Sequence, residues 1–111
     1  MSVTWDMVER FVDAVSGICA KRRFAGVYGF PRGGLPLAVW ISHRAGLPLL
    51  LAPAEDALLV DDIADTGATL FRYRKSHFIA TMFYHRQSSV VPDFWMFEKK
   101  NDEWVVFPWE I

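Results

Sequence analysis

Apolar residues follow two different periods along this chain, one typical of helices and one typical of buried strands. Residues Thr4–Arg23 carry apolar side chains three and four positions apart, which predicts a helix capped by Thr4 or Asp6. The same spacing predicts a helix over Leu35–Ala45 and a short one over Leu70–Lys75. Between the helices lie short, nearly continuous apolar runs, which predict strands buried on both faces. These strands are expected at Phe24–Gly29, Leu47–Leu51, Ala57–Val60 and Phe78–Tyr84.

Strands that alternate with helices indicate an α/β fold with a parallel sheet and helices on both of its faces. Near the end of the chain, Phe94–Phe97 and Trp104–Phe107 flank a polar turn at Lys99–Asp102, which predicts a small antiparallel hairpin. The 111 residues are 52% hydrophobic, which is enough for one domain over residues 1–111 and leaves little room for a second.

Acidic residues end the apolar run of the central strand. Asp61 and Asp62 follow Val60 directly, and their carboxylates suit either a vicinal diol or a hydrated divalent cation. A third acid, Asp65, leads into a Thr-Gly-Ala-Thr turn. We therefore expect this strand to reach the edge of the sheet at an acidic end.

The turn itself, residues 66–69, has the composition of a phosphate site. A helix start leaves backbone N–H groups without partners, and the helix dipole adds partial positive charge there. Gly67 lets the backbone approach a ligand closely, and Ala68 adds no bulk. The hydroxyls of Thr66 and Thr69 can donate to phosphate oxygens. Phosphate donors beside acceptors for a diol predict a ribose 5-phosphate site.

A second glycine-rich turn stands between the first expected strand and the following helix. Gly33 and Gly34 expose consecutive backbone amides, and Arg32 adds a cation. The position after a strand and before a helix favours an anion site over a plain turn.

These motifs resemble those of a known family. The stretch Leu58–Leu70 resembles the phosphoribosyl pyrophosphate motif of type I phosphoribosyltransferases. The Arg32-Gly33-Gly34 turn resembles the family's pyrophosphate loop, with Pro31 where a serine often stands, and the resemblance implies a cis peptide bond between Arg32 and Gly33. The segment Trp104–Glu110 resembles the C-terminal part of xanthine–guanine and related purine phosphoribosyltransferases.

The resemblance implies an enzyme that transfers ribose 5-phosphate from phosphoribosyl pyrophosphate to a 6-oxopurine (guanine, xanthine or hypoxanthine) and releases pyrophosphate. It implies that Asp65 is the catalytic carboxylate beside N7 of the base, and that Mg²⁺ binds with Asp61 and Asp62. Trp104 would stack on the base, and Val105 would offer main-chain groups to its edge. The remaining ligand contacts would come from Arg32, Gly33, Gly34, Thr66, Gly67, Ala68 and Thr69.

One position departs from the purine branch of the family. That branch has a lysine near the end of the strand expected at Phe78–Tyr84, where it contacts the exocyclic oxygen of the base. This chain has His85 or Arg86 there instead. Either can donate a hydrogen bond, but with a different geometry.

Composition narrows the possible partners and the compartment. The formal net charge is −1, so no global basic field argues for nucleic acid. The single cysteine excludes an internal disulfide and any Cys-based metal site, and a reducing, cytoplasmic compartment is expected. No apolar stretch approaches the length of a membrane span. The resemblance further implies a homo-oligomer, a dimer or a tetramer.

Two alternatives remain at the level of sequence. A regulatory protein of the same fold would bind phosphoribosyl pyrophosphate or a nucleotide without turnover. The short segment Ala52–Asp56, where the family usually has a longer mobile lid, favours it, whereas Asp65 and Trp104 favour the enzyme. The second alternative, an unrelated phosphotransfer domain, could use Asp61 and Asp62. It would also need a lysine and a threonine at later strand ends, and the sequence offers no convincing lysine there.

Overall fold

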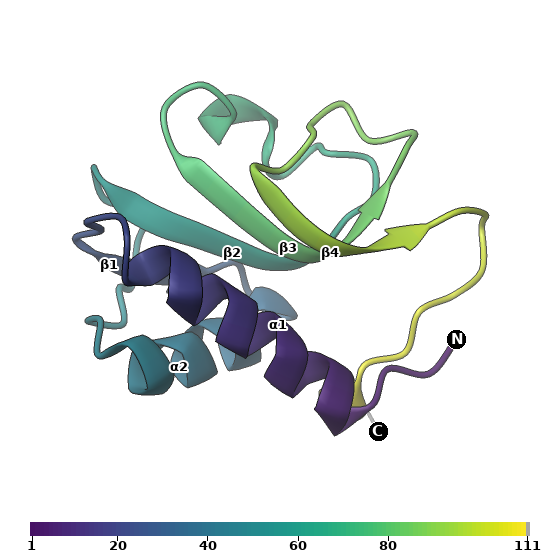
Figure 1. The fold of residues 1–111 in the computed structure, drawn as a ribbon. Coiled ribbons are helices and arrows are strands. Elements are labelled where there is room, and N and C mark those ends of the chain that lie inside the picture. The colour runs from purple at the N-terminus through teal and green to yellow at the C-terminus, as the bar shows by residue number, and fades with distance from the viewer. Residues whose placement is uncertain (111) are drawn as a thin grey trace.

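A four-stranded, fully parallel sheet forms the centre of the protein (Figure 1). The computed structural model describes residues 1–110. The strand order is β1-β2-β3-β4, which confirms the parallel α/β fold. In chain order the elements are α1 (Trp5–Cys19), β1 (Gly26–Gly29), α2 (Gly34–Ala45), β2 (Ala57–Ala64), the 3₁₀ turn η1 (Phe71–Tyr73), β3 (Phe78–His85), β4 (Phe94–Lys99) and the 3₁₀ turn η2 (Pro108–Glu110).

Helix α1 forms where its apolar spacing predicted it. Its N-cap is Thr4, whose hydroxyl accepts a hydrogen bond from the Met7 N–H at 3.2 Å. The helix ends at Cys19, four residues earlier than predicted, and the following Arg22 places its guanidinium 4.6 Å from the centre of the Phe78 ring. Basic residues after the helix thus cover an aromatic side chain rather than extend the helix.

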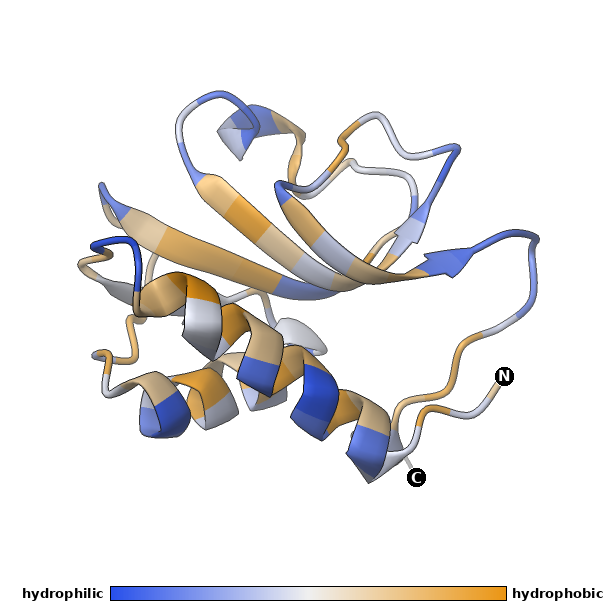
Figure 2. Cartoon of the chain, in the orientation of Figure 1, coloured by the Kyte–Doolittle hydropathy of each residue, from blue (hydrophilic) through white to orange (hydrophobic). Residues whose placement is uncertain are grey.

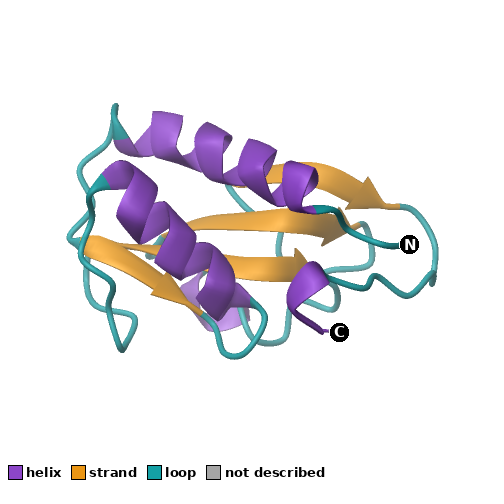
Figure 3. Cartoon of the chain, turned by 90° about the horizontal axis from the view of Figure 1, so that it is seen from below, coloured by secondary structure: helices purple, strands orange, loops and turns teal. Residues whose placement is uncertain are grey.

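Both α-helices lie on the same face of the sheet, a difference from the predicted arrangement (Figures 1 and 3). Their apolar sides face the strands, and their polar sides face outward (Figure 2). The main core therefore lies between the helices and one face of the sheet. It includes Val8, Phe11, Val12 and Val15 of α1, Leu37 and Ile41 of α2, and Leu58, Val60 and Met82 of the strands.

The opposite face is covered by η1 and loops, and its smaller core includes Leu59, Leu70, Ile79 and Val90. Crossover handedness explains the division. From β1 the chain passes through α2 to Leu49, which bridges the outer edge of β1. It then returns to pair β2 with the other edge, and each later strand adds on that side. Crossovers that move in opposite directions cover opposite faces.

The predicted strand Leu47–Leu51 was wrong, because only a single bridge forms there, between Leu49 and Val27. The Val27 N–H donates to Pro48 O and the Leu50 N–H donates to Val27 O. Pro48 has no N–H to donate to a neighbouring strand, and Leu51, three residues later, is 95% exposed. Backbone pairing between this segment and β1 is therefore limited to the single bridge at Leu49.

The predicted C-terminal hairpin was also wrong. Its first half is β4, which pairs in parallel with β3 through partners such as Phe83 and Phe97. An apolar run without alternation suits a parallel strand with both faces covered, and here Phe94 packs on Phe11 while Trp95 packs on Tyr84. The second half is not a strand; Val106 forms one bridge with Ser2 near the N-terminus.

No helix within residues 1–110 combines the length and the hydrophobicity that crossing a lipid bilayer requires.

Candidate active site

The polar residues singled out in the sequence gather at the carboxyl ends of β1 and β2. This is the point where the chain, having gone outward from β1 to Leu49, returns to the other side of β1. Open α/β sheets bind ligands at such a switch point, because the loops there diverge and leave a crevice.

The prediction that the central strand ends at the acids was wrong. Strand β2 continues through Asp61 and Asp62 to Ala64. The ladder with β3 explains the difference, since Asp61 pairs with Thr81 and Ile63 pairs with Phe83. The Asp62 N–H donates to the Asp61 carboxylate at 2.9 Å, and the Ile63 N–H donates to the Asp62 carboxylate at 2.8 Å. The two acids are thus held within a rigid strand rather than on a loop.

The Arg32–Gly34 turn packs directly onto these acids. A Cβ on Gly33 would overlap the Asp62 carboxylate, and a Cβ on Gly34 would come within 2.6 Å of Val60 O. The turn is tied to the sheet by the Phe30 N–H, which donates to Val60 O at 3.0 Å. The cis peptide bond joins Pro31 to Arg32, one bond before the predicted position.

Burial makes the acidic pair reluctant to ionise. Loss of solvent, followed by repulsion from Asp62, raises the pKa of Asp61 to about 8. Burial also raises the pKa of Asp62, and the charge of Glu110 adds to that effect. A bound cation would favour both carboxylates in their ionised form.

The carboxylates of Asp61 and Asp62 fit a hard divalent cation that takes its remaining ligands from water and substrate. Within residues 1–110, no three His, Cys, Asp or Glu side chains come together as a metal-binding group. Mg²⁺ commonly takes one or two protein carboxylates and completes its octahedron with water and substrate oxygens. Asp61 and Asp62 therefore suit a cation that arrives with a phosphorylated substrate.

The Thr66–Thr69 turn is correctly placed, but the helix predicted over Leu70–Lys75 is wrong. Only the three residues of η1 are helical, so no helix dipole strengthens the site. The turn is closed by the Phe71 N–H, which donates to Gly67 O at 2.9 Å, and Gly67 has a φ of 87°. It surrounds a pocket of about 140 Å³ together with Asp61 and Asp65. The anion site therefore depends on the amides and hydroxyls of the turn.

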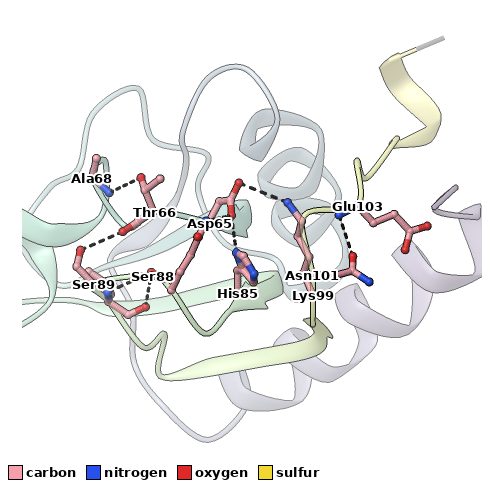
Figure 4. A network of polar contacts seen from close by, with 11 residues as sticks. Asp65, Thr66, Ala68, His85, Ser88, Ser89, Lys99, Asn101 and Glu103 are labelled. Carbon is pink, nitrogen blue, oxygen red and sulfur yellow. Dashed lines mark hydrogen bonds and ion pairs between the residues drawn. The ribbon is translucent and has the colours of Figure 1, made fainter.

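Two serines that the sequence analysis overlooked fix this turn. The N–H and the hydroxyl of Ser89 both donate to Thr66 O, at 2.8 and 3.2 Å. A Cβ on Gly67 would meet the hydroxyls of Ser88 and Ser89 within 2.7 Å. These contacts link the β3–β4 connection to the phosphate turn (Figure 4).

Asp65 is the centre of a second polar network (Figure 4). Its Oδ1 accepts from His85 Nδ1 and from Gln87 Nε2, each at 3.0 Å, and its Oδ2 lies 3.6 Å from Lys99 Nζ. Burial alone would raise the pKa of Asp65, but the hydrogen bonds from His85 and Gln87 and the charge of Lys99 together lower it. Asp65 is therefore an ionised acceptor at neutral pH.

Trp104 lies beside this network. A pocket of about 150 Å³ is lined by Asp62, Ile63, Asp65, Lys99, Trp104, Val105, Phe107 and Glu110. Trp104 is 77% exposed, and its main-chain oxygen accepts from the N-terminal ammonium of Met1 at 2.9 Å. An exposed indole beside a small pocket is available for stacking rather than used in the core.

A larger pocket of about 550 Å³ lies on the other side of Asp62. Arg32, Gly33, Pro36, Asp62, Trp109 and Glu110 line it. Because Asp62 borders both pockets, and Asp61 and Asp65 border the phosphate turn, the structure brings together every residue predicted for the site. The sequence analysis missed Gln87, Lys99 and Glu110; Lys99 had been assigned only to a polar turn.

Known proteins resemble this chain in sequence and in fold. No protein-family model matches the chain. The chain is similar to the xanthine-guanine phosphoribosyltransferase of Chromohalobacter salexigens, with 28% identity over 136 residues that cover 99% of this chain and 83% of that protein. It is 29% identical to the enzyme of the same name from Nitratidesulfovibrio vulgaris, over 97% of this chain and 83% of that one.

Among solved structures, the purine phosphoribosyltransferase from Pyrococcus horikoshii matches with a TM-score of 0.85 and 29% identity, over 100% of this chain and 94% of that one. In sequence and in fold, the chain is similar to purine phosphoribosyltransferases. This agrees with the resemblance found at Leu58–Leu70. The xanthine-guanine-hypoxanthine phosphoribosyltransferase of Helicobacter pylori, 20% identical with a TM-score of 0.72, shares the fold.

This chain is shorter than the relatives that it matches. The alignment with the Chromohalobacter protein extends over 136 positions, 25 more than this chain has residues. In the structure, residues 50–56 alone connect the Leu49 bridge to β2.

Proposed function

We propose that this protein transfers ribose 5-phosphate from phosphoribosyl pyrophosphate to a 6-oxopurine and releases pyrophosphate. One observation carries the proposal: the acidic pair of β2 lies between the Arg32–Gly34 turn and the phosphate turn, with an exposed indole beside it. That arrangement matches the donor substrate, in which the ribose carries pyrophosphate at C1 and phosphate at C5, with the base arriving at C1. Relatives named xanthine-guanine phosphoribosyltransferase support the choice of base class.

Each part of the donor substrate has a proposed partner. The amide of Gly33 and the Arg32 guanidinium would bind the pyrophosphate, whereas the Gly34 N–H donates to Phe30 O at 2.8 Å and holds the turn in shape. The amide of Gly67 and the hydroxyls of Thr66 and Thr69 would bind the 5-phosphate, and the Ala68 N–H, which donates to Thr66 Oγ1 at 3.2 Å, would orient that hydroxyl. Asp61 and Asp62 would accept from the ribose hydroxyls and would hold Mg²⁺, which neutralises charge on the leaving pyrophosphate.

Catalysis would depend mainly on alignment and charge. Exchange of groups at the anomeric carbon passes through an oxocarbenium-like state, which well-placed negative charge stabilises. Asp65 would accept the proton of base N7 or stabilise the charge that develops there. His85 and Gln87 would keep Asp65 ionised and correctly oriented, because both donate to its Oδ1.

The base would lie between β4 and the C-terminal segment. Trp104 would stack on one face of the purine, and the main-chain groups of Val105 would contact its edge. His85, whose Nδ1 is bonded to Asp65, would keep Nε2 for the base side.

We also propose that the protein acts in the cytoplasm as a homo-oligomer, a dimer or tetramer. The exposed apolar side chains of Trp5, Leu35 and Val39 on α1 and α2 support a contact between copies. Light scattering after size-exclusion chromatography measures the stoichiometry directly.

The decisive experiment incubates the protein with phosphoribosyl pyrophosphate, Mg²⁺ and guanine, xanthine, hypoxanthine or adenine, and follows nucleotide formation. We expect product with at least one 6-oxopurine. Tight binding of phosphoribosyl pyrophosphate or of a nucleotide, without product from any base, would instead support the regulatory alternative.

A further inference from the structure

A pocket of about 280 Å³ lies at the end of the sheet away from the candidate active site. The segments after α1 and after η1, the start of β3 and the β3–β4 connection line it, through Arg22, Arg74, Lys75, Ser76, His77, Phe78 and Asp93. The candidate active site lies at the carboxyl ends of the strands. The eight-residue strand β3 spans roughly 23 Å from Phe78 to His85, so a small ligand at one end does not contact the other (Figure 1).

Positive charge collects in this pocket without a matching acid. Arg22, Arg74 and Lys75 are cations at neutral pH, and none of them forms an ion pair within residues 1–110. Asp93 is the only carboxylate among the described lining residues, and its Oδ2 already accepts from the Ile79 N–H at 2.8 Å. Like charges that share a small volume repel each other. A bound anion would relieve that repulsion.

Aromatic rings hold both guanidinium groups of the pocket in place. The guanidinium carbon of Arg22 lies 4.6 Å from the centre of the Phe78 ring and 5.7 Å from that of Phe24. The guanidinium of Arg74 lies 3.6 Å from the centre of the Phe71 ring, and its Nη1 donates to Phe71 O at 2.7 Å. Stacking uses the face of a guanidinium and leaves the N–H groups along its edge available for an anion.

Hydrogen bonds fix the wall of the pocket that residues 74–77 form. The N–H groups of Ser76 and His77 both donate to Tyr73 O at 3.1 Å. His77 Nε2 lies 3.0 Å from Ala54 O, and because a carbonyl oxygen can only accept, this nitrogen carries a proton. The other ring nitrogen, Nδ1, lies 2.8 Å from Ser76 Oγ. The wall is therefore ordered before a ligand arrives, which reduces the entropy that binding would cost.

We propose that this pocket is a second anion site, which binds a small molecule that carries two or more linked phosphate groups. The edge of a guanidinium matches two phosphate oxygens at once, and the Lys75 ammonium adds a further cation. Three cations beside one carboxylate that is already hydrogen-bonded suit a ligand with several negative charges. The site shares no lining residue with the candidate active site, so its occupant is separate from the substrates of the transfer reaction.

Calorimetry with inorganic tripolyphosphate in EDTA tests the proposal. Arg22→Gln/Lys75→Gln removes two positive charges from the lining, and Arg74 is kept because it also bonds the main chain of η1. The control, Arg23→Gln/Arg72→Gln, removes two charges from exposed residues nearby that do not line the pocket. We expect the first variant to raise the Kd at this site by about tenfold or more, and the control by less than about threefold.

Because Arg22 packs on Phe78, the single variant Lys75→Gln provides a second measurement that changes only an exposed side chain. It should raise the same Kd by about threefold or more. Equal losses of affinity in the two double variants, or no loss in folded Lys75→Gln, would overturn the proposal. A binding event that is lost in Arg32→Gln instead would place the ligand at the pyrophosphate turn and would also overturn it.

The chemical class of the ligand is tested by two further probes. Citrate that binds as tightly as tripolyphosphate would overturn the assignment to phosphate. Single-stranded RNA that binds where tripolyphosphate does not would make the pocket part of a nucleic-acid surface and would overturn the small-molecule site. Nucleotide formation should be unchanged in Arg22→Gln/Lys75→Gln, so the outcome for this pocket and the outcome for the proposed function are read separately.

Discussion

Gly33 and Asp62 are in direct contact, and only a residue without a side chain fits at position 33. The backbone of Gly33 is right-handed helical, with φ −64° and ψ −31°, a conformation that any residue adopts. Glycine is therefore required here by the carboxylate and not by the backbone. The contact fixes the pyrophosphate turn against the acidic strand.

Gly33→Ala should destabilise the protein by about 1–3 kcal/mol, because the new methyl group overlaps the Asp62 carboxylate. It should also weaken phosphoribosyl pyrophosphate binding. Gly17→Ala is the control: nothing lies within 4 Å of its Cβ, and within α1 the change should stabilise by about 0.5–1 kcal/mol. Urea unfolding measures both. The double variant Gly33→Ala/Asp62→Ala should lose less stability than the two single variants lose together. If the losses simply add, the overlap with the Asp62 carboxylate does not cause the destabilisation.

Binding of phosphoribosyl pyrophosphate should depend on Mg²⁺. Asp61 and Asp62 are buried and adjacent, so a cation would compensate charges that are otherwise unfavourable. We expect calorimetry to give a much lower affinity in EDTA than in Mg²⁺, and Asp61→Asn/Asp62→Asn to remove the difference. Equal affinity with and without the metal would argue against a cation at this pair.

Stability of the metal-free protein should fall as pH rises from about 4 to 8. Burial first, and repulsion from Asp62 second, raise the pKa of Asp61 from 3.8 to about 8. Across this window the unfolded chain loses the Asp61 proton while the native state keeps it, so the native state binds more protons and stability decreases with pH. Asp61→Asn should flatten this slope and raise the stability at pH 8 by an amount on the order of 1 kcal/mol. Urea titrations in EDTA at several pH values test this, and an unchanged slope in the variant would contradict it.

Loss of both hydroxyls in the phosphate turn, Thr66→Ala with Thr69→Ala, should weaken phosphoribosyl pyrophosphate binding by about 1–3 kcal/mol. Thr66 Oγ1 also accepts from the Ala68 N–H at 3.2 Å, so part of its effect would come from a looser turn. Thr66→Ser keeps that bond and serves as the control. Unchanged affinity in calorimetry, with the fold intact, would remove these hydroxyls from the site.

Trp104→Ala should raise the KM for the base by about tenfold, because stacking of a base on an aromatic ring contributes about 1–3 kcal/mol. Its effect on the melting temperature should be small, since Trp104 is 77% exposed and its main-chain bond to Met1 remains. Affinity for phosphoribosyl pyrophosphate should stay nearly unchanged. Trp95→Ala is the control and should mainly cost stability, because Trp95 packs on Tyr84 with ring centres 5.3 Å apart. A large loss of stability in Trp104→Ala would make this residue part of the core.

The sequence by itself indicated the family resemblance and most of the residues that the structure gathers at the candidate site, because the motifs are local. The residues Asp61 to Thr69 are consecutive, and so are Arg32 to Gly34, so their order and chemistry can be read without a fold. The helical spacing around Phe11 and Leu37 likewise depends only on neighbours along the chain.

The tertiary structure decided what depends on distant partners. The segment Phe94–Lys99 became a fourth parallel strand because β3 offered a free edge, where local pattern suggested a hairpin. Helix α2 and η1 cover opposite faces, because crossover direction fixes which face each connection covers. Helix α1 precedes the first strand and packs beside α2. Lys99 meets Asp65 only through the registers of β2 with β3 and of β3 with β4, which bring together residues 34 positions apart. Neither segment by itself indicates that contact.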